Sequence, residues 1–382
     1  MSKHIHVTQT ITPVDGTKLA LPIKHKPKQA LALLIPGHNE ELVIQHTITS
    51  AIKAGLPARH IYVVDDASTD TTAKLARKLL GKKNVLTVKR SGKAGAILKA
   101  IKAFKIELKY QWLHIADADS AFENNYFEDF LRNLDPEKYV AAAGYVKSQH
   151  GGWISRYRAY EYAFGQEIMR RVQHMLGVIP VIPGPTSCFR TDILRELDFT
   201  TGNITEDFDI TLQIHRNKLG KIAYIPTARA LTQDPKNYRD YIHQITRWYR
   251  GFWRGIIDRK VGLRAQRIDF YLGYQIMEMF LYYFNVLVLL PILLIRGGAA
   301  QAIALTFLID AGLFFASVVM GAVVHKRMSV LSAFPLFYIL RVTNMFVYLK
   351  AFVEVVLLRR HRGKAKGWSV GNRRYKIAEA TS

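Results

Sequence analysis

The sequence contains a single cysteine, Cys188, and few acidic residues for its length. One cysteine excludes an internal disulfide framework and any metal site built from several thiolates. Against 54 lysines and arginines there are only 30 aspartates and glutamates, which gives a net charge of +24. Such an excess of positive charge implies an anionic partner. Nucleic acid, anionic lipid headgroups and a phosphorylated substrate are all compatible with it.

Two further signals are missing from the sequence. Residues 1–29 are polar and basic and have no apolar core, so we expect neither a signal peptide nor a membrane anchor there. No Walker A loop and no Gly-x-Gly-x-x-Gly motif occurs, so dinucleotide binding is not indicated. Long apolar runs are confined to the part after residue 268, so any membrane attachment is expected there.

Short apolar runs alternate with helical patterns in the first half of the chain. This pattern is typical of a parallel sheet covered by helices on both faces, in which ligands bind beyond the carboxyl ends of the strands. We expect strands at residues 30–35, 61–64, 85–88 and 112–116, and helices at 40–54, 68–80 and 94–104.

Acidic residues directly follow the carboxyl ends of two of these strands. Asp66 follows the second strand, and Asp117 and Asp119 follow the fourth. In an extended segment Asp-x-Asp places both carboxylates on one side, which suits a hard divalent cation that also binds a diphosphate. The alternative is that these residues only form turns and helix caps. Lys93 lies in a glycine-punctuated loop before a helix, a plausible anion cradle but weak evidence alone.

These motifs, in this order, resemble those of family 2 inverting glycosyltransferases with the GT-A fold. The residues that carry the resemblance are Pro36 to Glu40, Val64 to Thr71, Gly92 to Gly95, and Asp117 to Asp119. The resemblance implies that Asp66 contacts the uracil of a nucleotide-sugar and that Lys93 lies near the nucleotide. It also implies that Asp117 and Asp119 bind the diphosphate through Mg2+ or Mn2+.

Two later segments match the acceptor half of that family. Residues 183–190 contain two prolines and a glycine, which argues against a regular element, and resemble the loop that shapes the acceptor pocket through Gly184 and Cys188. Cys188 also fits a small packing residue, because nothing marks it as a thiolate. Thr205, Glu206 and Asp207 match the Thr-Glu-Asp motif, in which the aspartate is the general base. The same residues also fit a helix cap, and capping does not exclude catalysis.

Residues 244–248 match the Gln-x-x-Arg-Trp signature of processive members such as hyaluronan, chitin, cellulose and poly-N-acetylglucosamine synthases. On a helix, Gln244, Arg247 and Trp248 share one face. Arginine can stabilise a departing diphosphate, and an indole offers an apolar surface to a sugar ring. The resemblance therefore assigns Gln244 and Arg247 to the donor diphosphate and Trp248 to the acceptor.

Two apolar runs, residues 270–295 and 299–324, are long enough to span a membrane. Glu278 and Asp310 interrupt them and are expected to face protein or a polar conduit, not lipid. The third run, residues 331–358, contains polar residues at helical spacing, which favours an interfacial or re-entrant helix. The positive-inside rule places His325 to Arg327, and therefore the catalytic domain, in the cytoplasm.

The basic tail contains Trp368, Arg373 and Arg374 in a segment that resembles the gating loop that hyaluronan and chitin synthases fold over the nucleotide. A polybasic tail that meets anionic lipid is an equal alternative. We therefore expect five parts: a basic extension (1–29), a cytoplasmic GT-A domain (30–242), interfacial helices (243–268), membrane helices (269–358) and a cytoplasmic tail (359–382).

The predicted function is metal-dependent polymerisation of a UDP-sugar, with UDP-N-acetylglucosamine as the preferred donor, at an inner or plasma membrane. The expected partners are the UDP-sugar, a growing glycan and the bilayer, without nucleic acid. Two alternatives stay open: transfer of one sugar to a polyprenyl phosphate or glycolipid, and a basic binding protein without catalysis. Most processive members carry spans before the catalytic domain, and we recognise none here.

Overall fold

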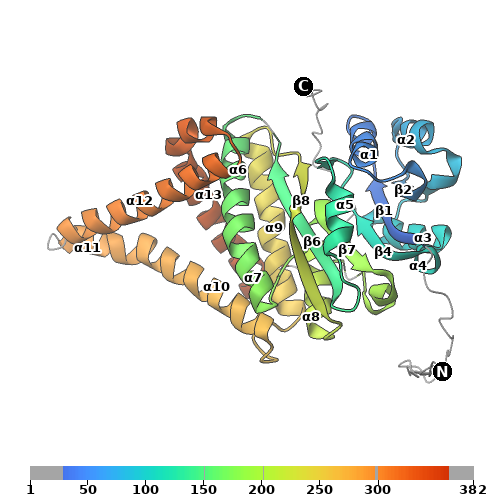
Figure 1. Ribbon diagram of the computed structural model, residues 1–382. Coiled ribbons are helices and arrows are strands. Elements are labelled where there is room, and N and C mark those ends of the chain that lie inside the picture. The colour runs from blue at the N-terminus through green and yellow to red at the C-terminus, as the bar shows by residue number, and fades with distance from the viewer. Residues whose placement is uncertain (1–28, 150, 201, 297–299, 361–382) are drawn as a thin grey trace, which may run out of the picture.

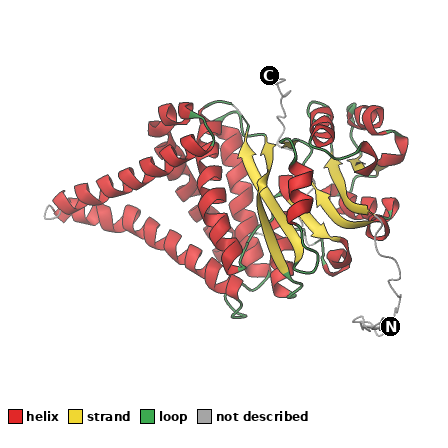
Figure 2. Cartoon of the chain, in the orientation of Figure 1, coloured by secondary structure: helices red, strands yellow, loops and turns green. Residues whose placement is uncertain are grey.

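The structure is a computed structural model that describes residues 29–149, 151–200, 202–296 and 300–360. Strands and helices alternate in its first half, and helices dominate its second half (Figures 1 and 2). The strands are β1 (Gln29–Gly37), β2 (Ile61–Asp66), β3 (Val85–Val88), β4 (Tyr110–Ile115), β5 (Ala121–Phe122), β6 (Tyr139–Ser148), β7 (Ser187–Arg190) and β8 (Lys221–Thr232).

The helices fall into those of the sheet domain and those that follow it. The first group is α1 (Ile44–Lys53), α2 (Thr72–Leu80), α3 (Gly92–Phe104), α4 (Ile106–Lys109), α5 (Tyr126–Asn133), α6 (Trp153–Phe164), α7 (Arg170–Leu176) and α8 (Glu206–Arg216). The second group is α9 (Tyr238–Asp258), α10 (Arg267–Phe284), α11 (Leu290–Arg296), α12 (Ala300–Val324) and α13 (Phe334–Phe352). Single turns of π-helix join α6 to α7 and α10 to α11.

The described strands form one sheet in the order β3-β2-β1-β4-β7-β6-β8-β5. Strands β1 to β4 pair in parallel, and β6 pairs in parallel with β8. The antiparallel strand β7 lies between these two parallel groups, so the sheet is mixed but mostly parallel. The carboxyl ends of β2 and β4 therefore lie at one edge, which places Asp66 and the Asp117–Asp119 segment on the same side of the sheet.

The apolar runs form strands because both faces of the sheet are covered. In β1, Leu31, Leu33 and Ile35 belong to the core on one face, and Ala32 and Leu34 belong to the core on the other. This two-residue alternation is the geometry of a strand buried on both sides. The four strands expected from residues 30–116 are all present, with ends that differ by up to two residues.

Residues 183–190 differ from the expectation. The two prolines and the glycine are followed by a regular strand, β7, and the segment 184–186 before it is a short 3-10 turn. The prediction failed because the helix- and strand-breaking residues are confined to the first half of the segment. Ser187 to Arg190 are free to pair with β4 and β6.

Three stretches are long and apolar enough to cross a membrane: Arg267–Leu293, Phe307–Val324 and Met328–Leu357. The first two project from the body as a hairpin, which is the orange arm in Figure 1. The third stretch is more buried than the first. In its most apolar 18-residue segment 39% is buried, compared with 6% in the first stretch, because α13 packs along α9 and contacts α6. Length and composition do not test whether α13 spans, so its interfacial character stays a prediction.

Buried and half-buried ion pairs connect these parts. Arg216 on α8 donates to both carboxylate oxygens of Asp269 on α10, at 2.5 and 2.9 Å, and both side chains are almost fully buried. Between α12 and α13, Arg341 pairs with Asp310 through both guanidinium nitrogens at 2.9 and 3.0 Å. The carboxylate of Asp310 therefore faces protein, as expected from its depth in an apolar run.

Candidate active site

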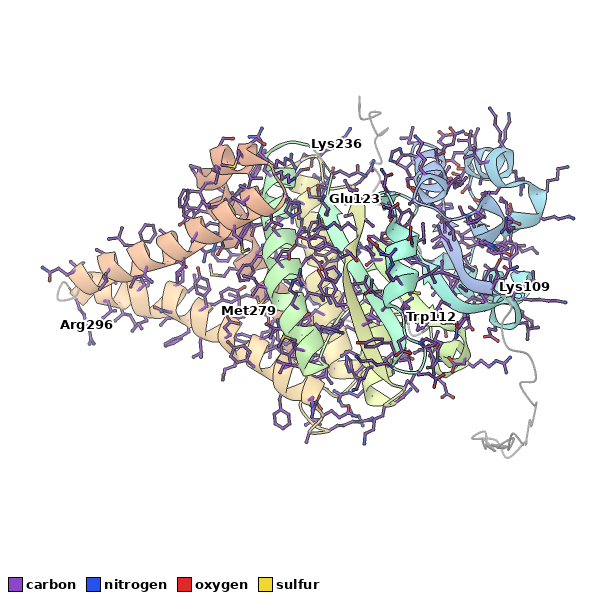
Figure 3. All side chains as sticks on the ribbon, viewed as in Figure 1. Lys109, Trp112, Glu123, Lys236, Met279 and Arg296 are labelled. Carbon is purple, nitrogen blue, oxygen red and sulfur yellow. The ribbon has the colours of Figure 1, made fainter. Side chains whose placement is uncertain are left out.

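A cavity of about 1780 Å3 opens at the carboxyl ends of the central strands. Its walls come from the loop before α3, the turn after β4, the helix α6–α7, the start of α8, and α9. It extends past α9 to one face of α10. Lys236, before α9, and Met279, on α10, are both among the lining residues and are labelled in Figure 3.

Lys93 joins two of these walls. Its Nζ lies 2.7 Å from Oδ1 of Asp117 and 2.5 Å from Oε1 of Glu206, which come from the turn after β4 and the start of α8. Burial lowers the pKa of Lys93, but the charges of Asp117 and Glu206 outweigh it and raise the pKa above its ordinary value. Lys93 is therefore a permanent cation at the centre of the cavity.

Asp66 lies beside the loop that leads into α3. The helix begins at Gly92, so Lys93 lies in its first turn and not in the loop where it was expected. The Asp66 carboxylate is fully buried; one oxygen accepts the backbone N–H of Ser91 at 2.7 Å, and the other accepts that of Gly92 at 2.8 Å. Asp66 thus holds the loop in place and is not among the residues that line the cavity. Its contact with a uracil stays a prediction.

Asp117 and Asp119 both line the cavity, and Asp119 is almost fully buried. Gly184 lies directly against Asp117: a Cβ at position 184 would stand 2.5 Å from the Asp117 Oδ2, so a larger residue there would displace the Asp117 carboxylate. Within the described residues no group of three or more His, Cys, Asp or Glu side chains could hold a metal by itself. Two carboxylates suit Mg2+ or Mn2+ when a substrate diphosphate supplies further oxygens.

Thr205, Glu206 and Asp207 lie at the start of α8 on the cavity wall. Glu206 and Asp207 are its first two residues, and Thr205 precedes them without forming a side-chain cap hydrogen bond. Burial and the neighbouring Glu206 charge raise the pKa of Asp207 to about 6, although Lys93, the Phe208 N–H and Arg247 oppose this shift. A carboxylate with this pKa is ionised at neutral pH yet basic enough to accept a proton.

Helix α9 passes unusually close to this segment. A Cβ on Gly251 would clash with the Thr205 side chain, and a Cβ on Gly255 would stand 2.6 Å from the Phe208 ring. Glycine at these two positions brings α9, and with it Gln244 to Trp248, against the start of α8. Gln244, Arg247 and Trp248 all line the cavity, on the shared helix face that their spacing predicted.

The remaining predicted residues lie elsewhere. Cys188 is fully buried in β7, where it pairs with His114 and Ala142, and burial raises the pKa of its thiol. It packs in the core and is not among the cavity-lining residues, which corrects its expected place in the acceptor pocket. Trp368, Arg373 and Arg374 lie outside the described residues.

Several cavity residues were not predicted. The wall formed by α6 and α7 contributes Tyr162, Gln166 and Arg170, and a turn of π-helix turns Gln166 toward the cavity side. Asp234, before α9, is buried, which raises its pKa to about 7, while Ser148 and Arg158 oppose the shift. No short motif marks these positions, because their place depends on packing between segments far apart in the sequence.

Comparison with known proteins gives three findings. A family model described as glycosyltransferase like family 2 matches residues 27–251. The poly-beta-1,6-N-acetyl-D-glucosamine synthase of Staphylococcus epidermidis is 26% identical over 265 residues, 64% of this chain and 62% of that protein. The hyaluronan synthase of Streptococcus pyogenes is 26% identical over 269 residues, 65% of this chain and 64% of that protein. The chain thus covers less than two thirds of either relative.

Among solved structures, a mannosyltransferase from Pyrobaculum calidifontis in complex with GDP-Man and Mn2+ superposes with a TM-score of 0.53. The match covers 81% of this chain and 89% of that one, at 16% sequence identity. At this identity the likeness concerns the fold.

Proposed function

The chain belongs to glycosyltransferase family 2 and has a GT-A-like fold, and we propose that it is an inverting transferase that polymerises a UDP-sugar at a membrane. The observation that carries this proposal is that one cavity collects Lys93 and Asp117, the proposed base Asp207, and the Arg247–Trp248 face of α9. Donor, base and acceptor groups thus surround a shared space.

In the proposed reaction the acceptor hydroxyl attacks the anomeric carbon of the donor. Asp207 accepts the hydroxyl proton as the new C–O bond forms, and the bond between the anomeric carbon and the diphosphate oxygen breaks. The electron pair of that bond leaves with UDP, and Lys93 and Arg247 stabilise the negative charge. A single displacement of this kind inverts the anomeric centre, so an α-linked UDP-sugar gives a β-linked product.

Asp117 and Asp119 would hold Mg2+ or Mn2+, which when bound neutralises charge on the diphosphate. Their position on the cavity wall beside Lys93 supports this assignment. Trp248 would support the terminal sugar of the acceptor through its indole face. Gln244 would bind the donor from the same face of α9.

The relatives support an amino-sugar donor. One is named as a synthase of poly-β-1,6-N-acetyl-D-glucosamine and the other as a hyaluronan synthase. UDP-N-acetylglucosamine is therefore the donor we propose. The membrane hairpin supports a domain that stays on one face of the bilayer: Arg267 begins α10 beside the sheet domain, and α12 returns to pack on α6. The positive charges at 325–327 favour the cytoplasmic face.

A second function is supported by the shape of the cavity. It continues past α9 to Gln275, Glu278 and Met279 on α10, a helix that is otherwise apolar and exposed. A lipid-linked acceptor, such as a polyprenyl phosphate, would reach the base along this path. On this view the enzyme transfers one sugar and does not polymerise.

The test is UDP release by the purified chain in nanodiscs with a panel of UDP-sugars, followed by sizing of the radiolabelled product. A ladder of long products supports polymerisation, and a single-sugar lipid product supports the second function. The Asp207→Asn variant should bind UDP but release none from any donor. If no donor gives UDP release, or if this variant is fully active, the chain is not the proposed transferase and a binding role remains.

A further inference from the structure

Arg158 on α6 is buried directly behind the Gln244–Trp248 face of α9. Its side chain is only 4% exposed, its Nη1 donates to Glu161 at 2.6 Å, and its Nη2 donates to the Gln244 Oε1 at 2.7 Å. The guanidinium carbon also stands 4.6 Å from the centre of the Trp248 ring and 4.8 Å from that of Tyr241. One arginine thus contacts two of the motif residues that line the cavity.

Stability alone does not explain a cation at this place. Burying a guanidinium is costly, and apolar residues of similar volume often replace buried ion pairs without loss of stability. The pairing is also incomplete, since within the described residues the Nε of Arg158 has no hydrogen-bond partner. Apart from the ion pair with Glu161 on the same helix, the contacts of Arg158 are directed toward α9. We infer from this that Arg158 orients residues of α9.

The chemistry of the guanidinium fixes the orientation of Gln244. An arginine has only donors, so the amide must present its oxygen to Arg158 and turn its NH2 group away. Because Gln244 also lines the cavity, the NH2 group is left to serve as a donor there. The Arg158 guanidinium over the indole face likewise favours one orientation of the Trp248 ring.

A second set of contacts connects this arrangement to α13. Asn344 donates to the hydroxyl of Tyr157 at 3.2 Å and to Glu161 at 3.4 Å, and it accepts the Tyr241 hydroxyl at 2.7 Å. Glu161 and Tyr241 are also partners of Arg158. The position of the guanidinium is therefore fixed from α6, α9 and α13 together.

We propose that Arg158 is a positioning residue for the Gln244–Trp248 face of α9, which sets the indole of Trp248 for the acceptor and the amide of Gln244 for the donor. The inference rests on the proposed function, in which Trp248 supports the acceptor sugar. It assigns no contact between Arg158 and the substrate. Its loss should therefore impair acceptor use through Trp248 and weaken the donor contact of Gln244, while Lys93, Asp117 and Arg247 keep their places in the donor half of the cavity.

The experiment compares Arg158→Met and Arg158→Lys with a matched control, Arg156→Met, on the same helix. Arg156 donates to Ser332 and does not contact α9. The probes are UDP-N-acetylglucosamine and a short β-1,6-linked N-acetylglucosamine oligosaccharide. In Arg158→Met we expect acceptor KM to rise about tenfold, because one charge-assisted hydrogen bond and one cation–π contact are lost. UDP binding should weaken less, by no more than about threefold, because Lys93, Asp117 and Arg247 stay in place around the donor.

The Lys variant keeps the cation but not the two-pronged geometry, so its acceptor KM should lie between those of Met and the unchanged chain. If Arg158→Met does not bind UDP at all and is therefore misfolded, the Arg158→Lys variant is used for the test instead. A normal acceptor KM and product length in a folded Arg158 variant overturn the proposal.

Tryptophan emission provides a readout that needs no substrate. The difference between the spectra of the unchanged chain and Trp248→Phe isolates the signal of Trp248. Arg158→Met should shift that signal and Arg156→Met should not; an unshifted signal overturns the proposal. If Trp248→Ala still makes polymer at the normal rate, the proposed function fails instead, whatever the Arg158 variants do.

Discussion

Lys93 and Glu206 are in contact across the cavity, with 2.5 Å between the lysine Nζ and the carboxylate Oε1. Lys93 begins α3, on the side of the predicted nucleotide motifs, and Glu206 begins α8, next to the proposed base. In the proposed function the charge of Lys93 serves the donor diphosphate, and the same charge lowers the pKa of Asp207. We therefore expect donor binding and proton transfer to be coupled through this lysine.

Replacing Lys93 with methionine should change two quantities at once. Donor KM should rise about tenfold or more, because a charge-assisted contact with the diphosphate is lost. The pKa of Asp207 should also rise, because the Lys93 charge lowers it in the unchanged chain. The acid limb of the kcat/KM profile should then move to higher pH. Lys99→Met, an exposed change on the same helix, is the control and should move neither.

The unchanged enzyme should lose kcat/KM as the pH falls through about 6, the value to which burial raises the pKa of Asp207. The same shift affects stability. A folded-state pKa above the ordinary value of 3.8 means that the folded chain holds this proton more tightly, so stability is lost as the pH rises through about 6.

Asp207→Asn should therefore abolish transfer yet raise the melting temperature near pH 8, with little change near pH 3. Thermal unfolding followed in detergent at both pH values checks this. A lower melting temperature at pH 8 would contradict the assigned burial of the carboxylate.

Gly251→Ala should destabilise the chain and reduce transfer, although alanine normally favours a helix interior by about 1 kcal/mol over glycine. Here we expect alanine to be less stable than glycine, because a methyl group at position 251 has no space beside the Thr205 side chain. Gly273→Ala on α10 is the control, since nothing lies within 4 Å of a Cβ there. Equal melting temperatures for the two variants would show that α9 and α8 separate more easily than the structure indicates.

Chelation by EDTA should abolish transfer, and added Mg2+ or Mn2+ should restore it, if Asp117 and Asp119 hold a divalent cation. Asp119→Asn should raise the concentration of metal that gives half-maximal rate. Full activity of the chelated enzyme would assign charge neutralisation to Lys93 and Arg247 alone. Titration of the rate with each metal distinguishes the two ions.

Asp310→Asn should lower the melting temperature in nanodiscs, because it leaves the Arg341 guanidinium without its carboxylate in an apolar region. The exchange Asp310→Arg with Arg341→Asp should recover part of that loss by restoring a pair of opposite charges. If Asp310→Asn is as stable as the unchanged chain, this ion pair does not hold α12 to α13.

The sequence predicted best where a residue's role depends on its neighbours in the chain. The strand at 30–35 was predicted by a local apolar run and is present as β1. Local spacing predicted a helix after Asp207, and α8 begins two residues earlier than expected, at Glu206. The parallel sheet then brought Asp117 to the cavity, because strand ends of one direction share an edge. The GT-A-like fold and the family followed from these ordered motifs.

Residues whose role depends on distant packing could not be predicted in this way. Arg158 meets Gln244 and Trp248 across more than eighty positions of sequence, and an arginine in an amphipathic helix usually faces water. The sequence predicted a loop at Cys188, because the prolines just before it argue against a strand. In the structure Cys188 belongs to the strand β7. In both cases the partner that decides the environment lies on another element.

The buried pair of Arg216 and Asp269 gives the enzyme a mechanical property. The helix that begins at Glu206 and Asp207 is joined through this pair to the first helix of the membrane hairpin. A hydrophobic helix tilts to match the thickness of the bilayer around it, so we expect a tilt of α10 in a membrane to move α8 through the two hydrogen bonds of this pair. The turnover rate should therefore depend on lipid acyl-chain length, which would make the bilayer itself a regulator of this transferase.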